Sequence, residues 1–226
     1  SSILVAAALA SRGIPAEHVD ATTVMITNDQ FEKAEPRADK IAEASQKILR
    51  PIVERGGVPV MGGYIGSTEQ GTVTTLGRGG SDFSASLFGA ALGADAIEIW
   101  TDVDGVLSAD PRRVPSAQVI DQLSYNEAME LAYFGAKVIH PQTMAPAIGR
   151  SIPIYIRNTF APDHPCTLIC AAPKSDLVVK GITTIENIAL INIEGAGMIG
   201  VPGTAHRLFG ALREEGIESI MVNCNP

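Results

Sequence analysis

The chain has 226 residues, of which 46% are hydrophobic and 19% charged, so it can bury a sizeable core and disorder is not expected. Its formal net charge of −8 argues against a nucleic-acid or anionic-membrane surface, but it leaves room for a local basic site that holds a small anion. Three cysteines without a CxxC pair fit a reducing compartment better than a disulfide framework or a zinc site. No apolar run reaches transmembrane length.

The first part of the chain alternates between helical and strand-like patterns. Residues 3–10 form an apolar run that predicts a helix ending at Gly13, and residues 37–49 carry apolar side chains at helical spacing. Residues 56–66 predict a short strand followed by a glycine turn. Because this run lacks an initiator Met and reads as the middle of a helix, we expect the chain to be a piece of a longer protein.

The middle of the chain continues the alternation. Residues 96–101 predict a strand, residues 124–136 a helix that begins with a capping box of Ser124 and Glu127, and residues 152–158 another strand. A short helix with Pro141 in its first turn lies between the last two. This order predicts an α/β fold with a mainly parallel sheet that is covered on both faces.

Three polar turns follow predicted strands directly. They occupy residues 62–66, 101–106 and 157–162. Because ligands of α/β sheets bind beyond the carboxyl ends of the strands, we expect these turns to gather at one edge of the sheet.

The last fifty residues differ in pattern from the rest. Residues 171–177 read as a linker, and a strand, a helix and a strand are predicted at 188–198, 202–216 and 217–223. We therefore expect two domains, at 1–172 and 173–226, of which the second is incomplete.

The stretch TTLGRGGSD, residues 74–82, combines flexible backbone with polar side chains directly before an apolar helix pattern. Its glycines let a ligand approach the backbone, and the free N–H groups at a helix start favour an anion. Arg78 can bind a carboxylate or phosphate with two parallel hydrogen bonds, and Ser81 or Asp82 can cap the helix. The alternative is a tight turn in which Asp82 is an ordinary N-cap.

Three acidic and then two basic residues follow the strand at 96–101. They are Asp102, Asp104, Asp110, Arg112 and Arg113. Spaced acids of this kind suggest a divalent metal, but the EF-hand pattern is not met, and a turn stabilised by aspartate side chains is the alternative.

Lys137 lies two residues after Gly135 in FGAKVIHP, and alone it reads as a solvated lysine. Together with Arg78 and Arg112 it could hold a polyphosphate. His140 precedes a proline, and we interpret it as a helix cap rather than a catalyst.

One motif suggests a different function. Residues 195–200 match GxGxxG, which is typical of dinucleotide-binding proteins and would indicate an NAD-dependent oxidoreductase. The fingerprint requires a helix that opens within the glycines, whereas Pro202 intervenes here, so this reading is disfavoured. The chain contains no Walker A motif.

Four stretches in a fixed order resemble the successive motifs of the aspartate kinases. They are TTLGRGGSDFSA (74–85), IWTDVDGVLSADPR (99–112), ELAYFGAKVIHP (130–141) and PIYIRNTF (153–160). Residues 179–212 resemble the start of the ACT regulatory region that follows the kinase domain, in a form closer to the bifunctional aspartate kinase–homoserine dehydrogenases.

The resemblance implies an amino-acid-kinase three-layer sandwich followed by a partial ACT domain of ferredoxin-like α+β fold. It implies phosphorylation of L-aspartate to 4-phospho-L-aspartate by ATP with Mg²⁺, the first step towards lysine, threonine and methionine. It also implies feedback by threonine or lysine, homo-oligomers that pair through ACT domains, and a cytoplasmic location, or a plastid in a plant.

Carried over by position, the resemblance assigns a role to nine residues. Arg78 and Ser81 hold the aspartate α-carboxylate, with Gly63 and Gly66 near the substrates and Asp82 at the catalytic centre. Thr101 and Asp102 contact the adenine side, and Arg112 and Lys137 the nucleotide phosphates. No protein metal ligand is assigned.

Two parts of the family pattern are missing from this chain: a KFGGTS-like glycine loop and the glutamate that binds the aspartate amino group. We therefore expect that this polypeptide alone does not catalyse the reaction. The alternatives are another amino-acid kinase, such as one acting on glutamate, and a regulatory module that only binds an amino acid.

Overall fold

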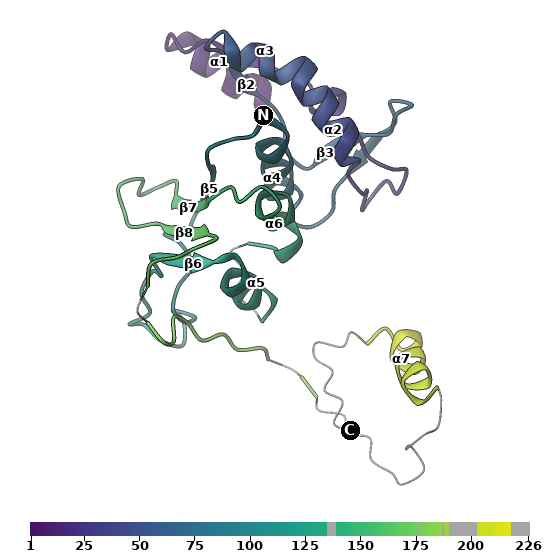
Figure 1. Cartoon of the computed structure of the whole chain (residues 1–226), viewed down its shortest axis with the longest axis vertical. Helices are drawn as coiled ribbons and strands as arrows, with labels where there is room; N and C mark the ends of the chain where they lie inside the picture. The colour runs from purple at the N-terminus through teal and green to yellow at the C-terminus, as the bar shows by residue number, and fades with distance from the viewer. Residues whose placement is uncertain (135–138, 176, 187, 190–202, 218–226) are drawn as a thin grey trace. The chain divides into compact units, whose positions relative to one another are not determined.

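The structure, a computed structural model, describes the whole chain except residues 135–138, 176, 187, 190–202 and 218–226. The chain divides into two compact units, Ser1–Ile185 and Glu186–Pro226 (Figure 1). Residues 173–185 thus belong to the first unit by their contacts, while the domain boundary expected at 172/173 stays a prediction. Among the described residues, no helix is both long and apolar enough to span a membrane.

The first unit opens with the predicted apolar helix, α1 (Ser2–Ser11), which ends shortly before Gly13 with its positive φ of 81°. Strand β1 (Ala16–His18) then pairs in parallel with β2 (Val58–Val60). A short 3₁₀ turn, η1 (Ala21–Thr23), follows β1.

The helix predicted at residues 37–49 is longer than expected. It runs as α2 (Ala38–Ala44), a π turn η2 (Ser45–Leu49) and α3 (Arg50–Glu54). It buries Ile41 and Leu49 of the predicted apolar face, and also Ile52, which lies beyond the predicted range.

A hairpin that the sequence did not reveal follows β2. Strands β3 (Ile65–Ser67) and β4 (Val73–Thr75) pair antiparallel, and the chain then enters α4 (Gly80–Leu92). Gly93, with φ 67° and ψ 48°, ends α4 in the left-handed conformation that glycine adopts at little cost.

A four-stranded sheet forms the second half of this unit, in the order β5-β7-β8-β6. Its strands are β5 (Ile97–Thr101), β6 (Gln122–Ser124), β7 (Ile154–Asn158) and β8 (Thr167–Cys170). The pairs β5–β7 and β6–β8 are parallel, and β7–β8 is antiparallel. The α/β class is therefore confirmed.

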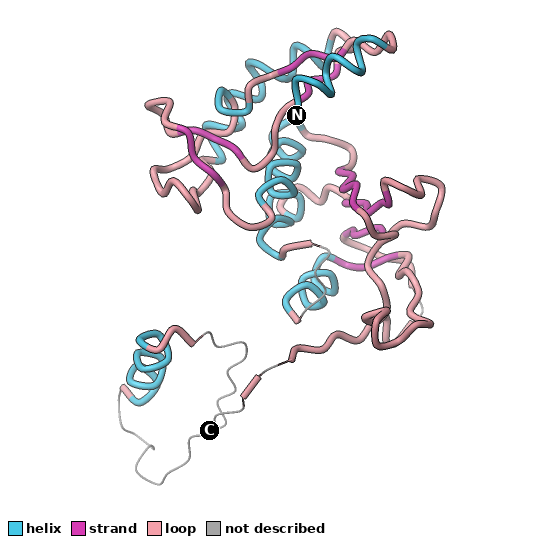
Figure 2. The backbone as a smooth tube through the Cα atoms, turned by 180° about the vertical axis from the view of Figure 1, so that it is seen from behind, coloured by secondary structure: helices cyan, strands magenta, loops and turns pink. Residues whose placement is uncertain are grey.

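Helices α4, α5 (Tyr125–Tyr133) and α6 (Pro141–Ile148) lie on the same side of this sheet (Figures 1 and 2). The predicted capping box is present, because the Ser124 hydroxyl accepts from the Glu127 N–H and the Glu127 carboxylate accepts from the Ser124 N–H. The sheet residues that face these helices form the main core, which includes Ile97, Ile99, Ile154, Ile156 and Ile169.

The opposite side of the sheet corrects one expectation. Glu98 and Trp100 are exposed, and the guanidinium of Arg157 lies over the rings of Trp100 and Tyr155 while it pairs with Glu98 at 3.1 Å. The prediction of a sheet covered on both faces thus holds for one face only, as far as the described residues extend. Charged and aromatic side chains take the place of a covering helix there.

Of the second unit the structure describes mainly α7 (Thr204–Glu214), which confirms the predicted helix. The strands predicted around it fall almost entirely outside the described residues, as do the glycines of the GxGxxG match.

Candidate active site

The turn before α4, residues 77–82, is called the α4 turn below. Helix α4 begins at Gly80, with Gly79 as its N-cap residue at φ 70° and ψ 13°, and no side chain caps it. The expectation that Ser81 or Asp82 caps the helix is therefore wrong. A left-handed glycine makes the entry to the helix, so both side chains lie inside the first helical turn and remain free for other contacts.

The glycine turn at 62–66 lies directly against the α4 turn. A Cβ at Gly63 would lie 2.9 Å from the Cα of Ser81, so only glycine allows this approach. The Tyr64 N–H donates to the Ser84 hydroxyl at 3.0 Å, and that hydroxyl donates to the Gly80 carbonyl at 2.7 Å. The structure thus brings Gly63 and Ser81 together, as their common assignment to substrate binding requires.

Gly66 has a different environment from Gly63. It is buried within β3, where a Cβ would lie 2.5 Å from the Met25 carbonyl oxygen and 3.0 Å from Thr27 Cγ2. Packing alone explains the need for glycine at this position, and its contact with a substrate stays a prediction.

Two charged residues of the α4 turn have no partner among the described residues. Arg78 is exposed, and neither its guanidinium nor the carboxylate of Asp82 takes part in a hydrogen bond or ion pair within the described part of the chain. Asp82 is partly buried, and this burial raises its pKa above the ordinary value. A partly buried carboxylate and an exposed guanidinium near one helix N-terminus, both without a partner among the described residues, are candidates for binding a charged ligand.

Sequence reasoning missed two side chains near this turn. Tyr64 adopts a positive φ of 74°, which is uncommon outside glycine, and it lies close to Gly80. Lys33 places its Cγ 3.4 Å from the position of a Cβ at Gly77. The glycines on both sides of Tyr64 indicated an unusual backbone conformation in this turn. The position of Lys33 depends on tertiary packing, which no local sequence pattern predicts.

The loops that follow β5 and β7, residues 101–112 and 158–164, are called the sheet-edge loops below. The Thr159 N–H donates to the Thr101 carbonyl at 2.8 Å, and the Asn158 amide donates to Asp104 Oδ1 at 2.7 Å. His164 Nδ1 lies 3.3 Å from the same oxygen. Two of the three polar turns therefore meet at the carboxyl end of the sheet as predicted, whereas the third contacts the first turn of α4.

Two charged residues of the sheet-edge loops, Arg112 and Asp110, are paired with each other. Arg112 donates from Nε and Nη2 to the two carboxylate oxygens of Asp110, at 3.0 and 2.7 Å, and its backbone N–H also bonds Asp110. These bonds hold the pKa of Asp110 at about 2 and raise the pKa of Arg112. The bonds between Arg112 and Asp110 match the aspartate-stabilised turn.

The resemblance also assigns Thr101, Asp102 and Lys137 to nucleotide binding, and the structure gives fewer contacts for these residues. The Thr101 hydroxyl donates to the neighbouring Asp102 carboxylate at 3.1 Å, and Asp102 is exposed. Lys137 lies outside the described residues, so its assignment to the phosphates stays a prediction.

Helix α6 connects the FGAKVIHP motif to the α4 turn. A Cβ at Gly79 would lie 3.1 Å from Thr143 Cγ2 and 3.2 Å from His140 Cβ. His140 occupies the N-cap position of α6 as predicted, but its side chain makes no capping hydrogen bond, and its carbonyl accepts from the Thr143 hydroxyl at 2.6 Å. Two motifs that are sixty residues apart in sequence thus meet at α4.

Comparison with known protein families matches two parts of the chain. Residues 1–158 match the amino acid kinase family and residues 191–225 match an ACT domain. The chain therefore belongs to the amino acid kinase family. The GxGxxG match falls inside the ACT segment, which argues against a dinucleotide site.

Among its relatives, the chain is 44% identical to bifunctional aspartokinase/homoserine dehydrogenase 2, chloroplastic, of Arabidopsis thaliana, over 93% of this chain and 24% of that protein. It is 37% identical to lysine-sensitive aspartokinase 3 of Escherichia coli, over 96% of this chain and 48% of that protein. The chain thus spans about a quarter of the bifunctional relative and about half of the E. coli one.

Solved structures give the same result. The fold superposes on E. coli aspartokinase III in complex with aspartate and ADP (R-state) with a TM-score of 0.81 at 34% identity, over 99% of this chain and 50% of that one. The complex of the same enzyme with lysine and aspartate (T-state) gives a TM-score of 0.76 at 34% identity, with the same coverage. These matches confirm the predicted amino-acid-kinase fold followed by an ACT region.

Proposed function

We propose that the chain is part of an aspartate kinase, which transfers the γ-phosphoryl group of ATP to the side-chain carboxyl of L-aspartate. The observation that carries the proposal is the α4 turn, where the Arg78 guanidinium and the partly buried Asp82 carboxylate lie near a helix N-terminus and have no partner within the part of the chain that the structure describes. The high similarity to aspartokinase III, whose crystal structure contains aspartate and ADP, supports the choice of substrates.

The chemistry of this transfer sets what the residues must do. A carboxylate oxygen of aspartate forms a bond to the γ-phosphorus, and the bond from that phosphorus to the bridging oxygen of ADP breaks. The acceptor carboxylate is already ionised at neutral pH, so no proton moves and no general base is needed. Catalysis then consists of positioning two anions and neutralising their charge.

On the aspartate side, Arg78 would bind the α-carboxylate with its two parallel N–H groups, together with Ser81 and the N–H groups of the first turn of α4. Gly63 and Gly66 would keep the turn close to the substrates. Asp82 would order the cationic groups around the transferring phosphoryl group.

On the nucleotide side, Thr101 and Asp102 would contact the adenine, and Arg112 and Lys137 the phosphates. Arg112 would have to share or exchange its partner Asp110 to do so. When bound with the nucleotide, Mg²⁺ would supply further neutralising charge. It typically takes one or two protein carboxylates beside phosphates and water, which fits Asp82 as an available oxygen donor.

The residues that match an ACT domain support regulation and assembly as parts of the same proposal. We expect feedback inhibition by threonine or lysine and homo-oligomers that pair through these residues. The location we propose is the cytoplasm, or the plastid in a plant, and the Arabidopsis relative is named chloroplastic.

The test uses the protein translated from the complete reading frame. It is incubated with ATP and Mg²⁺ and either aspartate or glutamate, and hydroxylamine traps any acyl phosphate. We expect aspartate-dependent hydroxamate and ADP in equal amounts, and none with glutamate. Product with glutamate alone would indicate another amino-acid kinase, and amino-acid binding without any product would indicate a regulatory module.

A further inference from the structure

The sheet-edge loops hold a histidine to which neither the sequence motifs nor the proposed reaction gives a role. His164 lies in the loop after β7, and its Nδ1 lies 3.3 Å from Asp104 Oδ1 in the loop after β5. Its side chain is 62% exposed, so part of the ring faces solvent. A histidine that contacts the protein through one ring nitrogen can use the other nitrogen for a ligand.

The carboxylate that contacts His164 is held in place by the backbone that follows it. Asp104 precedes Gly105, where a Cβ would lie 2.5 Å from Thr167 Oγ1 on β8, so a side chain at this position would clash. The next N–H, that of Val106, donates to the same buried hydroxyl at 2.8 Å. The loop is thus fixed against β8 directly after Asp104, which restricts where its carboxylate can lie.

Asn158, the last residue of β7, joins the two loops through both ends of its amide. Its Nδ2 donates to Asp104 Oδ1 at 2.7 Å, and its Oδ1 accepts the Phe160 N–H at 2.8 Å. The His164 N–H donates to the Ala161 carbonyl at 3.0 Å, which closes the loop that carries the ring. The imidazole is therefore supported by both loops, and a supported side chain loses little conformational freedom when it binds a ligand.

The contact with Asp104 decides which ring nitrogen of His164 remains available. An ionised carboxylate only accepts hydrogen bonds, so the proton of a neutral imidazole belongs on Nδ1. Nε2 then carries a lone pair and can accept a hydrogen bond from a hydroxyl group. Within the described part of the chain, no hydrogen bond or ion pair uses Nε2 of His164.

The position of His164 at the site indicates which part of a nucleotide it would meet. Its loop begins beside the residue assigned to the adenine side, because the Thr159 N–H donates to the Thr101 carbonyl at 2.8 Å. Asp104 lies between Thr101 and the phosphate-side Arg112 along the loop after β5. The ribose of a nucleotide joins its base to its phosphates, and the ribose 2′- and 3′-hydroxyls are donors that a free imidazole nitrogen can accept from.

We propose that His164 is a specificity-determining residue whose Nε2 accepts a hydrogen bond from a ribose hydroxyl of the bound nucleotide, while Nδ1 stays on Asp104. The inference rests on the proposed kinase function and adds a contact that the motifs do not assign. Because this bond uses a free nitrogen, it forms without displacing a protein partner, in contrast to the contact proposed for Arg112.

The experiment measures the affinity of the protein from the complete reading frame for ADP, 2′-deoxy-ADP and 3′-deoxy-ADP by calorimetry with Mg²⁺. We expect the wild-type protein to bind at least one deoxy analogue about 10-fold more weakly than ADP, which is the effect of one hydrogen bond. His164→Ala should bind ADP and that analogue equally, because the group that distinguishes them is absent.

Further variants separate contact with the ligand from support of the loops. The amide of His164→Asn can replace Nδ1 and keep the bond to Asp104, but it has no atom at the position of Nε2, so the preference for ADP should be lost. His164→Gln can place its amide oxygen near the position of Nε2 and should keep part of the preference. His18→Asn, at another exposed histidine, is the matched control and should keep the wild-type ratio.

The ratio of the affinities for ADP and its deoxy analogues decides the proposal. If the wild-type protein binds ADP and both analogues equally, or if His164→Asn keeps the full wild-type preference, His164 does not contact the ribose. The hydroxamate assay is a separate readout. If the wild-type protein shows the ribose preference but makes no aspartyl phosphate, the proposed kinase function fails and the ribose contact stands.

Discussion

The α4 turn and the sheet-edge loops both carry arginine and aspartate residues, but these residues differ in whether they have partners within the protein. In the α4 turn, Arg78 and Asp82 have no partner within the described residues. In the sheet-edge loops, Arg112 is bound to Asp110, and Asp104 to Asn158 and His164. The charged groups of the α4 turn are thus available to a charged ligand, whereas these groups of the sheet-edge loops already bind other residues of the protein.

This difference suggests two modes of binding. Free groups on a rigid helix start can accept a substrate without breaking existing bonds, which favours a preorganised site. Paired groups must exchange partners, so their ligand binds with a local rearrangement. We therefore expect aspartate to bind to a preformed turn and the nucleotide to remodel the sheet-edge loops.

The largest effect is expected at Asp82. In the protein from the complete reading frame, Asp82→Asn removes the charge that we propose orders the cations, and kcat should fall by roughly 10³-fold in steady-state kinetics. Burial raises the folded-state pKa, so the ionised form disfavours folding as pH rises through that pKa. At pH 7 the neutral Asn should therefore leave the free energy of unfolding unchanged or slightly higher.

The exposed Asp95 offers a charge-matched control for this experiment. Asp95→Asn should retain wild-type kcat. A loss of stability in Asp82→Asn with kcat preserved would show that Asp82 only supports the helix.

The second effect concerns Arg78. Arg78→Lys keeps the charge but loses the planar pair of N–H groups, so the KM for aspartate should rise by about 10- to 100-fold. The KM for ATP should stay within about 2-fold if the two sides bind separately. Arg12→Lys, at an exposed position, serves as the control. An unchanged KM for aspartate would remove Arg78 from the site.

The third effect tests the link between the sheet-edge loops. Asp104→Ala removes the acceptor of Asn158 and His164, which should lower the free energy of unfolding by about 1 kcal/mol. Nucleotide affinity, measured by calorimetry with ADP and Mg²⁺, should fall about 5-fold, because each lost bond loosens the two loops. Asp163→Ala, next to His164 in the second sheet-edge loop, should change neither. An effect of Asp104→Ala on the KM for aspartate would contradict the separation of the two sides.

The smallest effect is expected at Asp110. If Arg112 must leave Asp110 to bind phosphate, Asp110→Asn should raise nucleotide affinity by about two- to five-fold, while Arg112→Gln should lower it. Because the pKa of Asp110 is lowered to about 2, the wild-type pair is complete above the ordinary pKa of 3.8 and is lost only as pH falls through about 2. Weaker nucleotide binding by Asp110→Asn would mean that Asp110 positions Arg112 rather than competing for it.

Local patterns sufficed for much of the fold. The capping box of Ser124 and Glu127 and the helix start at Pro141 depend on neighbouring residues, and both are present. The β3–β4 hairpin was missed because its strands have three residues each and their pairing is decided by contact with residues 25–27.

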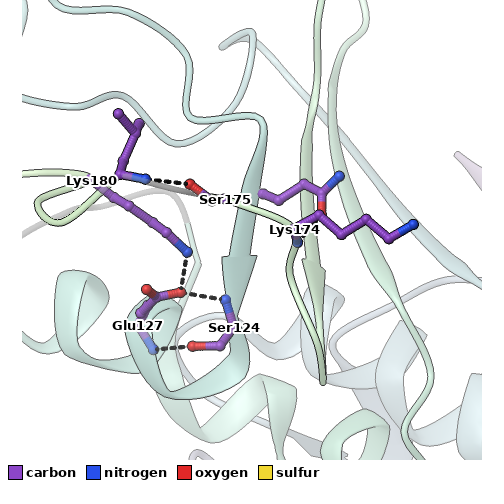
Figure 3. Close-up of polar contacts among 7 residues, drawn as sticks. Ser124, Glu127, Lys174, Ser175 and Lys180 are labelled. Atoms are coloured by element: carbon purple, nitrogen blue, oxygen red, sulfur yellow. Dashed lines mark hydrogen bonds and ion pairs between the residues drawn. The ribbon is translucent and has the colours of Figure 1, made fainter.

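The site shows the same division between local and tertiary information. The residue types of the α4 turn indicated an anion site, but the N-cap went to Gly79, because backbone conformation rather than hydrogen-bonding capacity decided the helix start. The pairing of Arg112 with Asp110 could have been predicted, because the two residues are only two positions apart in the sequence. The contact of Lys180 with Glu127 joins residues 53 positions apart, and no local sequence pattern predicts it (Figure 3).

Hydrogen exchange of the protein from the complete reading frame, with aspartate or with ADP and Mg²⁺, tests the comparison most directly. Aspartate should slow exchange at residues 77–84 and leave residues 101–118 unchanged. The nucleotide should change exchange across residues 101–118, where Arg112 exchanges its partner. If aspartate alters both regions equally, or if the nucleotide leaves the sheet-edge loops unchanged, the distinction between a preformed side and a rearranging side is wrong.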